Sequence, residues 1–121
     1  MKHIYDYLLY LGVKPSMKGF DYIVELVELA NKHGFNTMGI FTMYGELAKK
    51  HGVTAWSIER AVRHAICSAM NRNTGVWYDE FAELVNDDAL VTNKDLISGI
   101  LLKMRQGKVR LNDVKEEDNN G

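Results

Sequence analysis

The 121-residue sequence has one cysteine, one proline and no long apolar run. Cys67 has no second cysteine with which to form an internal disulfide, which favours a reducing, cytoplasmic setting. The single proline, Pro15, and the lack of a Ser/Gly-rich linker favour one domain over residues 1–111. Apolar runs stay well below the roughly 20 residues of a membrane span, and Asp6 interrupts the start of the chain where a signal peptide would be apolar. We therefore expect no membrane association.

Enzyme motifs are also missing. We find no P-loop, dinucleotide-binding fingerprint or Ser/His/Asp arrangement, so the sequence predicts neither an enzyme nor a bound cofactor. His64 and Cys67 share one helical face, but a structural zinc site needs four ligands, so we expect no metal there. The acidic residues between positions 73 and 91 lack the spacing of an EF-hand. They are typical of a solvated face, although they could also bind a basic partner.

Acidic and basic residues are nearly balanced, and the formal net charge is −1. This balance alone argues against nucleic-acid binding, but the distribution is uneven. Residues 43–72 carry a net charge of +3 and residues 103–110 a net charge of +4, whereas residues 73–91 carry −5. Basic stripes of this kind can still dock on phosphates. The segment 112–121 is acidic and too polar to pack, so we predict a disordered tail there.

What the sequence does contain is helical periodicity, with no convincing strand. Gly12 and Gly34 are predicted to end helices, and Thr54 and Thr92 to cap the starts of two others. Apolar spacing predicts helices over residues 3–11, 17–33, 38–50, 55–71 and 92–105, and a short amphipathic turn or helix over residues 77–85. The predicted fold class is all-α, a compact bundle of about six helices that contains a helix-turn-helix.

The helix-turn-helix is predicted from residues 44–63. Ala48 supplies the small residue that the first helix needs against its partner, and Gly52 tolerates the positive φ of the turn. Ile58 supplies the apolar residue that points from the second helix into the core. A second helix held in this way presents its outer face to the major groove of DNA, so the spacing predicts a DNA-binding protein.

The second helix has two chemically different faces when its residues are placed at about 100° intervals. The apolar face comprises Ile58, Ala61, Val62, Ala65, Ile66 and Ala69. The opposite face carries Trp56, Arg60, Arg63, His64 and Cys67, with Ser57 and Glu59 at its margins. Arginine suits guanine and phosphate, and glutamate can accept from cytosine or orient a neighbouring arginine. The alternative is that Glu59 and Arg63 form an i,i+4 salt bridge on a solvated face.

Four segments resemble the C-terminal effector domain of the stage 0 sporulation protein A family, which are response-regulator transcription factors. The most specific is residues 58–66, Ile-Glu-Arg-Ala-Val-Arg-His-Ala-Ile. The others are residues 11–22, 43–50 and 92–97, and the similarity runs from about Leu8 to Arg105. The resemblance implies a six-helix domain whose recognition helix, about residues 55–71, reads a short promoter box in double-stranded DNA. It also implies that two copies bind tandem boxes as a homodimer.

The resemblance implies roles for individual residues. Ser57, Glu59 and Arg60 fall on base-reading positions, although the family usually has arginine where this chain has the shorter Ser57. Trp56 stands where the family has a small residue, and it either packs on the DNA backbone or obstructs the family's docking pose. The resemblance gives phosphate-contacting or supporting roles to Arg63, His64, Thr92 and Asn93, of which the Thr-Asn pair opens the last helix. To these we add Lys49, Lys50 and Trp56 as further residues expected to contact phosphate or support the interface.

Only about ten residues precede the resemblance, so we expect no phosphoacceptor receiver domain. The chain is then either an excised domain or a stand-alone paralogue, and the Met1 start and unrelated tail favour the second. The first functional hypothesis is a sequence-specific transcriptional regulator, which could also contact RNA polymerase. The alternative hypothesis is a protein-interaction module that modulates a full-length regulator, with Trp56 and Val53 as its anchor.

Overall fold

A computed structural model of the chain describes residues 1–35, 37–88 and 90–111. The tail predicted over residues 112–121 lies outside the described residues. The described chain forms helices almost throughout, with two very short strands near its ends. In chain order the elements are β1 (Lys2–His3), α1 (Ile4–Leu11), α2 (Lys18–His33), α3 (Ile40–His51), α4 (Ala55–Arg72), α5 (Thr74–Phe81), the 3-10 turn η1 (Ala82–Leu84), α6 (Asn93–Arg105) and β2 (Val109–Arg110).

The predicted all-α fold with six helices is confirmed. Five helices begin and end within two residues of their predicted ranges, but α5 starts three residues earlier than the predicted 77–85 and gives way to η1 after Phe81. Thr74 and Gly75 have low helix propensity, which hid this start. Burial of Trp77 and a hydrogen bond from Thr74 Oγ1 to the Met70 carbonyl (2.7 Å) hold the segment in place. No described helix is both long and apolar enough to cross a membrane.

The expectation of no strand is wrong in one place. β1 and β2 pair in parallel, with Lys2 opposite Val109 and His3 opposite Arg110. The amide of Lys2 also donates to the carbonyl of Lys108 at 3.0 Å. Strands of two residues are too short to show a period in the sequence. The pairing is therefore visible only in the structure, where residues 2–3 lie beside residues 109–110.

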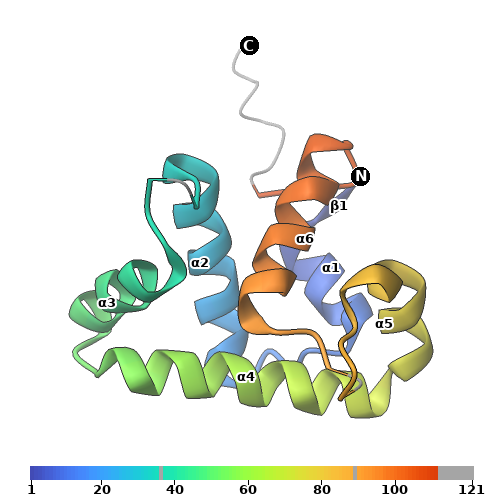
Figure 1. The fold of residues 1–121 in the computed structure, drawn as a ribbon, viewed down its shortest axis with the longest axis horizontal. Helices are drawn as coiled ribbons and strands as arrows, with labels where there is room; N and C mark the ends of the chain where they lie inside the picture. The colour runs from blue at the N-terminus through green and yellow to red at the C-terminus, as the bar shows by residue number, and fades with distance from the viewer. Residues whose placement is uncertain (36, 89, 112–121) are drawn as a thin grey trace.

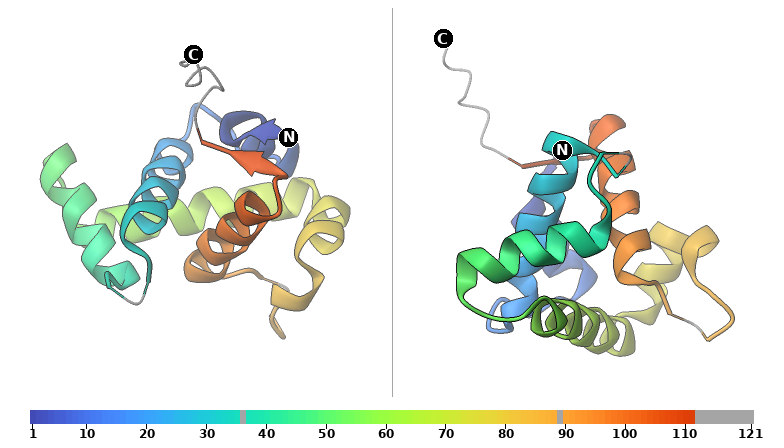
Figure 2. Two further views of the ribbon diagram at one scale, coloured as in Figure 1. Left: turned by 90° about the horizontal axis from the view of Figure 1, so that it is seen from above. Right: turned by 60° about the vertical axis from the view of Figure 1, so that its left-hand side comes forward.

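Helix α4 forms one long side of the molecule, along the lower edge of Figure 1. Helices α2 and α6 stand above it, α3 lies beside its N-terminal half, and α1 and α5 lie toward its C-terminal end. Figure 2 shows α2 and α6 crossing over α4 from opposite sides. The inner face of α4 is therefore covered by several helices, and its outer face is covered by none of the described elements.

The core lies between α4 and the helices above it, and the apolar face predicted for α4 is the face that is buried. Helix α2 approaches α4 closely at Gly19, where a Cβ atom would lie 2.4 Å from the carbonyl oxygen of Ala61. Only glycine allows this crossing without a shift of backbone. The buried residues of that face are Ile58, Val62, Ala65, Ile66 and Ala69, while Ala61 is half-buried.

Helices α3 and α4 form the predicted helix-turn-helix. Gly52 ends α3 in the left-handed conformation, with φ of 67°, and its amide donates to the carbonyl of Ala48. Thr54 caps α4, because its hydroxyl accepts from the amide of Ser57 at 3.0 Å. Ala48 and Ile58 are both buried where the two helices meet. The sequence spacing therefore set the angle at which α4 leaves the turn.

Candidate nucleic-acid interface

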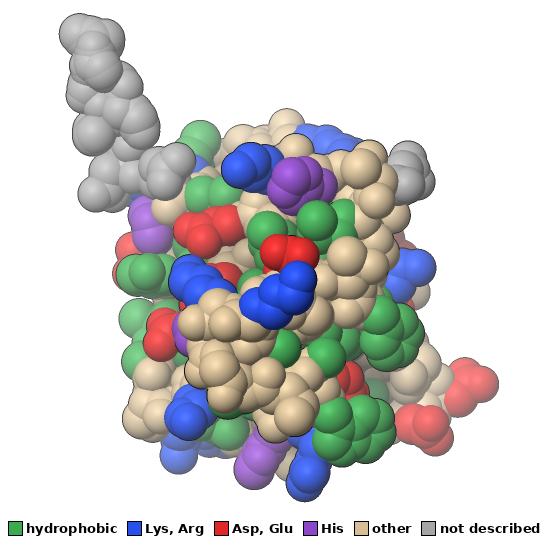
Figure 3. Space-filling view, turned by 90° about the vertical axis from the view of Figure 1, so that its left-hand side faces the viewer, with side chains coloured by type: hydrophobic (Ala, Val, Ile, Leu, Met, Phe, Trp, Pro, Cys, Tyr) green, Lys and Arg blue, Asp and Glu red, His purple; other side chains and the backbone are tan. Residues whose placement is uncertain are grey.

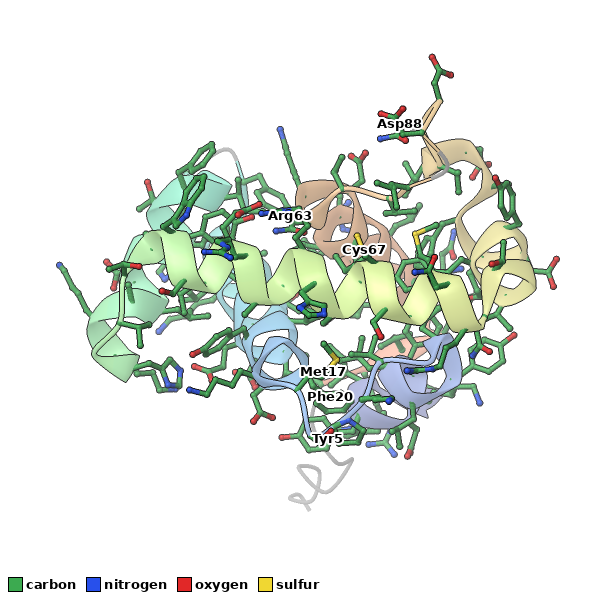
Figure 4. All side chains as sticks on the ribbon, turned by 90° about the horizontal axis from the view of Figure 1, so that it is seen from below. Tyr5, Met17, Phe20, Arg63, Cys67 and Asp88 are labelled. Atoms are coloured by element: carbon green, nitrogen blue, oxygen red, sulfur yellow. The ribbon has the colours of Figure 1, made fainter. Side chains whose placement is uncertain are left out.

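The outer face of α4 is an open polar surface. Figure 4 looks directly onto this face, and α4 crosses the view with no described element in front of it. Residues Ser57, Arg60, Ala61, Arg63, His64 and Cys67 line a shallow hollow on it. In Figure 3, which views the α3 end of the molecule, Lys, Arg and His side chains project along the lower edge. That edge is the side on which α4 lies in Figure 1.

Two of the residues expected to contact DNA are unengaged in the described structure. Arg60 and His64 are exposed, and within residues 1–35, 37–88 and 90–111 neither makes a hydrogen bond or an ion pair. An arginine without an internal partner breaks no hydrogen bond within the protein when it binds a ligand and exchanges only its bonds to water. Arg60 is therefore a cation on this face that is not held by another described residue.

Glu59 and Arg63 form the intrahelical salt bridge considered from the sequence. Arg63 Nε donates to Glu59 Oε2 at 3.0 Å, and a second contact from the guanidinium reaches Oε1 at 3.4 Å. The hydrogen bonding of Arg63 to the Glu59 carboxylate raises the pKa of Arg63, so this guanidinium stays charged. The side chain of Arg63 is nevertheless 56% exposed, so it lies at the surface with its charge partly matched. Contact of Arg63 with DNA would require it to share or exchange this carboxylate.

Ser57 and Trp56 differ sharply in reach. The hydroxyl of Ser57 lies 2.9 Å from the hydroxyl of the cap residue Thr54, which keeps it close to the backbone. Trp56 is 67% exposed, an unusual state for a large apolar side chain. Val53, in the preceding turn, is also exposed. The first turn of α4 thus exposes the large indole ring of Trp56 next to the short hydroxyl side chain of Ser57.

The two lysines at the end of α3 are in different states. Lys49 is exposed and has no partner among the described residues, whereas Lys50 Nζ lies 2.9 Å from Glu25 Oε1 on α2. His51 Nε2 lies 3.1 Å from both oxygens of the same carboxylate. Burial raises the pKa of Glu25, but the hydrogen bonds from Lys50 and His51 outweigh burial and leave this pKa below its ordinary value. Lys49 is therefore freer than Lys50 to hold a phosphate.

The Thr-Asn pair at the start of α6 divides its roles. Thr92 is exposed, and its hydroxyl accepts from the amide of Asp95 at 3.1 Å, which confirms the predicted cap. Asn93 is only 8% exposed and directs its amide inward. Its Nδ2 donates to the hydroxyl of Tyr44 at 3.0 Å and to the carbonyl of Glu59 at 3.2 Å. This geometry suits the supporting role considered for Asn93, whereas Thr92 is the exposed member of the pair.

Sequence reasoning missed Tyr44 and the use made of Arg72. Tyr44 is buried between α3 and α4, and its hydroxyl is the acceptor for Asn93. A tyrosine on the apolar stripe of a helix has a hydroxyl that needs a hydrogen-bond partner. This feature of the sequence could have indicated that Tyr44 has a buried polar contact. Arg72 counted only toward the basic charge of residues 43–72, but its guanidinium donates to the carbonyl of Gly12. No sequence pattern shows that contact, because the two residues are far apart in the chain.

A protein-family model matches this chain. The family model described as "Sporulation initiation factor Spo0A C terminal" covers residues 4–104, which is most of the 121 residues. The match includes α3, the Gly52 turn and α4, and it ends within α6. It agrees with the resemblance carried by residues 58–66.

Proposed function

Because the chain belongs to the Spo0A C-terminal family of DNA-binding effector domains, we propose that it is a sequence-specific regulator that reads double-stranded DNA with α4. In this proposal α4 enters the major groove, whose width of about 12 Å admits one α-helix. The protein acts by binding promoter boxes, and two copies occupy tandem boxes.

The observation that carries this proposal is the open outer face of α4, on which Arg60 has no partner among the described residues. The buried inner face fixes the helix, and no described element lies in front of the outer face (Figure 4). Arg60 can then donate two hydrogen bonds to a guanine, while Glu59 accepts from a cytosine or orients Arg63. Ser57 contributes a short-range contact at the same level.

The phosphate contacts come from residues around this reading surface. In this proposal Lys49, at the end of α3, and Thr92, at the start of α6, contact phosphates on either side of the reading surface. His64 and Arg63 reach phosphates from α4 itself, and the ring of Trp56 packs on a sugar. Lys50 also contacts a phosphate once its ammonium leaves the Glu25 carboxylate.

Selection of bound duplexes from a random pool tests the proposal. We expect a short enriched box, with the strongest preference at one guanine, and recovery of tandem copies of it. Fluorescence anisotropy on the enriched box and on single-base variants should give losses of about 1–3 kcal/mol per changed base pair. Equal affinity for all duplexes would remove the claim of specificity.

The salt dependence of binding separates the two lysines. Lys49→Ala should shallow the slope of log affinity against log salt by about one unit, since one phosphate contact is lost. Lys50→Ala should change the slope less, because Glu25 already neutralises that ammonium. Titrations of the selected duplex at several salt concentrations give both slopes, and a larger change for Lys50 would reverse this ranking.

A second candidate function is a protein-interaction module that pairs with a full-length regulator or with RNA polymerase. The specific observation in its favour is the exposed pair of Trp56 and Val53. Co-purification from the native host, with Trp56→Ala as control, tests it. Recovery of a partner protein that depends on Trp56, together with no enrichment of any duplex, would favour this candidate over DNA reading.

A further inference from the structure

The geometry points to Asn93 and the hydroxyl of Tyr44 as positioning residues that fix the base-reading turn of α4 in place. This inference rests on the proposed function, because it concerns how accurately Glu59 and Arg60 are presented to DNA. Neither residue is placed against DNA itself. Both act through the backbone of α4, from beneath the reading surface.

Apart from the polar tips of buried tyrosines and of Trp77, Asn93 is the one polar side chain that is buried among the described residues 1–35, 37–88 and 90–111. Its amide nitrogen has two hydrogens, and both are used inside the protein. One goes to Tyr44 on α3 and the other to the carbonyl of Glu59 on α4. Since Asn93 is the first residue of α6, this single amide joins three helices at one point.

The carbonyl of Glu59 belongs to the peptide unit that links Glu59 to Arg60. A hydrogen bond to this carbonyl therefore acts on the backbone of two proposed base-reading residues. The bond weakens steeply once donor and acceptor separate or tilt, so it resists sliding and rotation of α4 along its axis. The apolar contacts of Ile58 and Val62 bury α4 but are not directional, so they set depth better than register. Direct readout needs side chains held to within about 0.5 Å of their contact geometry.

The surroundings keep this contact rigid. Tyr44 is 3% exposed, and the ring of Phe41 packs edge-on against it with 5.7 Å between centroids. The cap by Thr92 holds the start of α6, from which Asn93 extends. Tyr44, Asn93, Glu59 and Arg63 all line one apolar hollow beside α4. A change at Tyr44 or Asn93 is thereby felt at the Glu59–Arg63 pair, with no direct loss of a DNA contact.

Removing one hydroxyl tests the inference. Tyr44→Phe keeps the buried ring and deletes only the acceptor for Asn93. Tyr7→Phe is the matched control, because Tyr7 is equally buried and its hydroxyl donates to Glu80 at 2.6 Å on α5, away from the Glu59 turn. Asn93→Leu removes both donors with little change in volume and gives a second variant on the same contact.

The readout is discrimination: the affinity ratio between the selected duplex and a duplex changed at the base read by Arg60. We expect Tyr44→Phe and Asn93→Leu to lower this ratio about three- to tenfold, the factor that one hydrogen bond represents. Tyr7→Phe should lower thermal stability while keeping the ratio within about twofold of wild type. The double variant should lose no more than Asn93→Leu alone, because both changes break the same contact.

A second readout needs no DNA. Amide hydrogen exchange should speed up at residues 59–63 in Tyr44→Phe, and residues 69–72 should stay as in wild type. Wild-type discrimination in both variants with unchanged exchange at residues 59–63 would overturn the inference. Absence of discrimination in the wild-type protein would instead overturn the proposed function, and the inference with it.

Discussion

The two ends of α4 carry similar side chains and use them in opposite ways. Near its start, Arg60 has no partner among the described residues and faces the open side of the molecule. At its end, Arg72 donates to the carbonyl of Gly12, and Asn73 donates to the carbonyl of Tyr10 at 3.2 Å. We call residues 55–64 the reading half of α4, and the set Arg72, Asn73 and Trp77 the anchoring end.

The anchoring end completes the hydrogen bonding of α1. The last carbonyls of a helix have no partner within it, and here the carbonyls of Tyr10, Leu11 and the cap residue Gly12 accept from side chains at the junction of α4 and α5. The indole of Trp77 supplies the third bond, to the carbonyl of Leu11 at 2.8 Å. An arginine on a recognition helix is therefore a candidate for DNA contact only when its donors are not already used in this way.

The largest effect should come from the anchoring end. Trp77 is fully buried, so Trp77→Ala should cost about 3–5 kcal/mol of unfolding free energy through the cavity and the unpaired carbonyl of Leu11. Urea unfolding measures the loss. Trp77→Phe keeps more of the volume and should remain folded with unchanged DNA discrimination, and a changed enriched box in this variant would contradict the division between the two ends.

The next effect compares the two arginines directly. Arg60→Ala should weaken binding to the selected box by about 1–3 kcal/mol and relax preference at one base pair, with the unfolding free energy nearly unchanged. Arg72→Ala should do the reverse, with about 1 kcal/mol lost from stability and the base preference intact. Anisotropy and urea unfolding on both variants form a crossed test. Equal effects of the two changes on discrimination would abolish the comparison.

The smallest effect concerns pH, because Glu25 on α2 and Glu80 on α5 each have a lowered pKa. At Glu80, burial raises the pKa, but hydrogen bonds from Tyr7 and Lys103 outweigh burial and lower it, as Lys50 and His51 do at Glu25. A carboxylate with a lowered pKa stabilises the fold above its unfolded-state value, and this stability is lost as pH falls through the folded-state pKa. Unfolding free energy should therefore fall once pH drops below the ordinary range of glutamate, about 4.3.

Glu25→Gln and Glu80→Gln separate the two contributions. The partners of Glu80 are better buried, since Lys103 is 14% exposed whereas Lys50 is 66% exposed. Glu80→Gln should accordingly destabilise the protein more at neutral pH and flatten its acid dependence more. Urea titrations across the acid range give both curves, and a steeper loss from Glu25→Gln would contradict this order.

Most of the fold was predictable because it depends on local rules. Apolar spacing placed five helices, Gly52 and Thr54 set the turn before α4, and the buried face of α4 followed from its period. The start of α5 and the pairing of β1 with β2 were not predictable. The burial of Trp77 fixes α5, and the approach of residues 2–3 to residues 109–110 produces the strand pair. Neither feature leaves a periodic signal in the sequence.

The residues of the candidate site were predictable from the sequence, but their hydrogen-bond partners and their burial were not. Residues 58–66 marked α4 as the proposed reading helix from the sequence, because the residues that share one helical face follow from their order in the chain. Tertiary structure decided which cations have partners. Lys50 pairs with Glu25 on α2 and Arg72 donates to the carbonyl of Gly12, whereas Arg60 has no partner among the described residues. The burial of Asn93 beneath Glu59 was decided there too. A side chain's partners come from segments far away in the chain, so folding alone brings them within hydrogen-bonding distance.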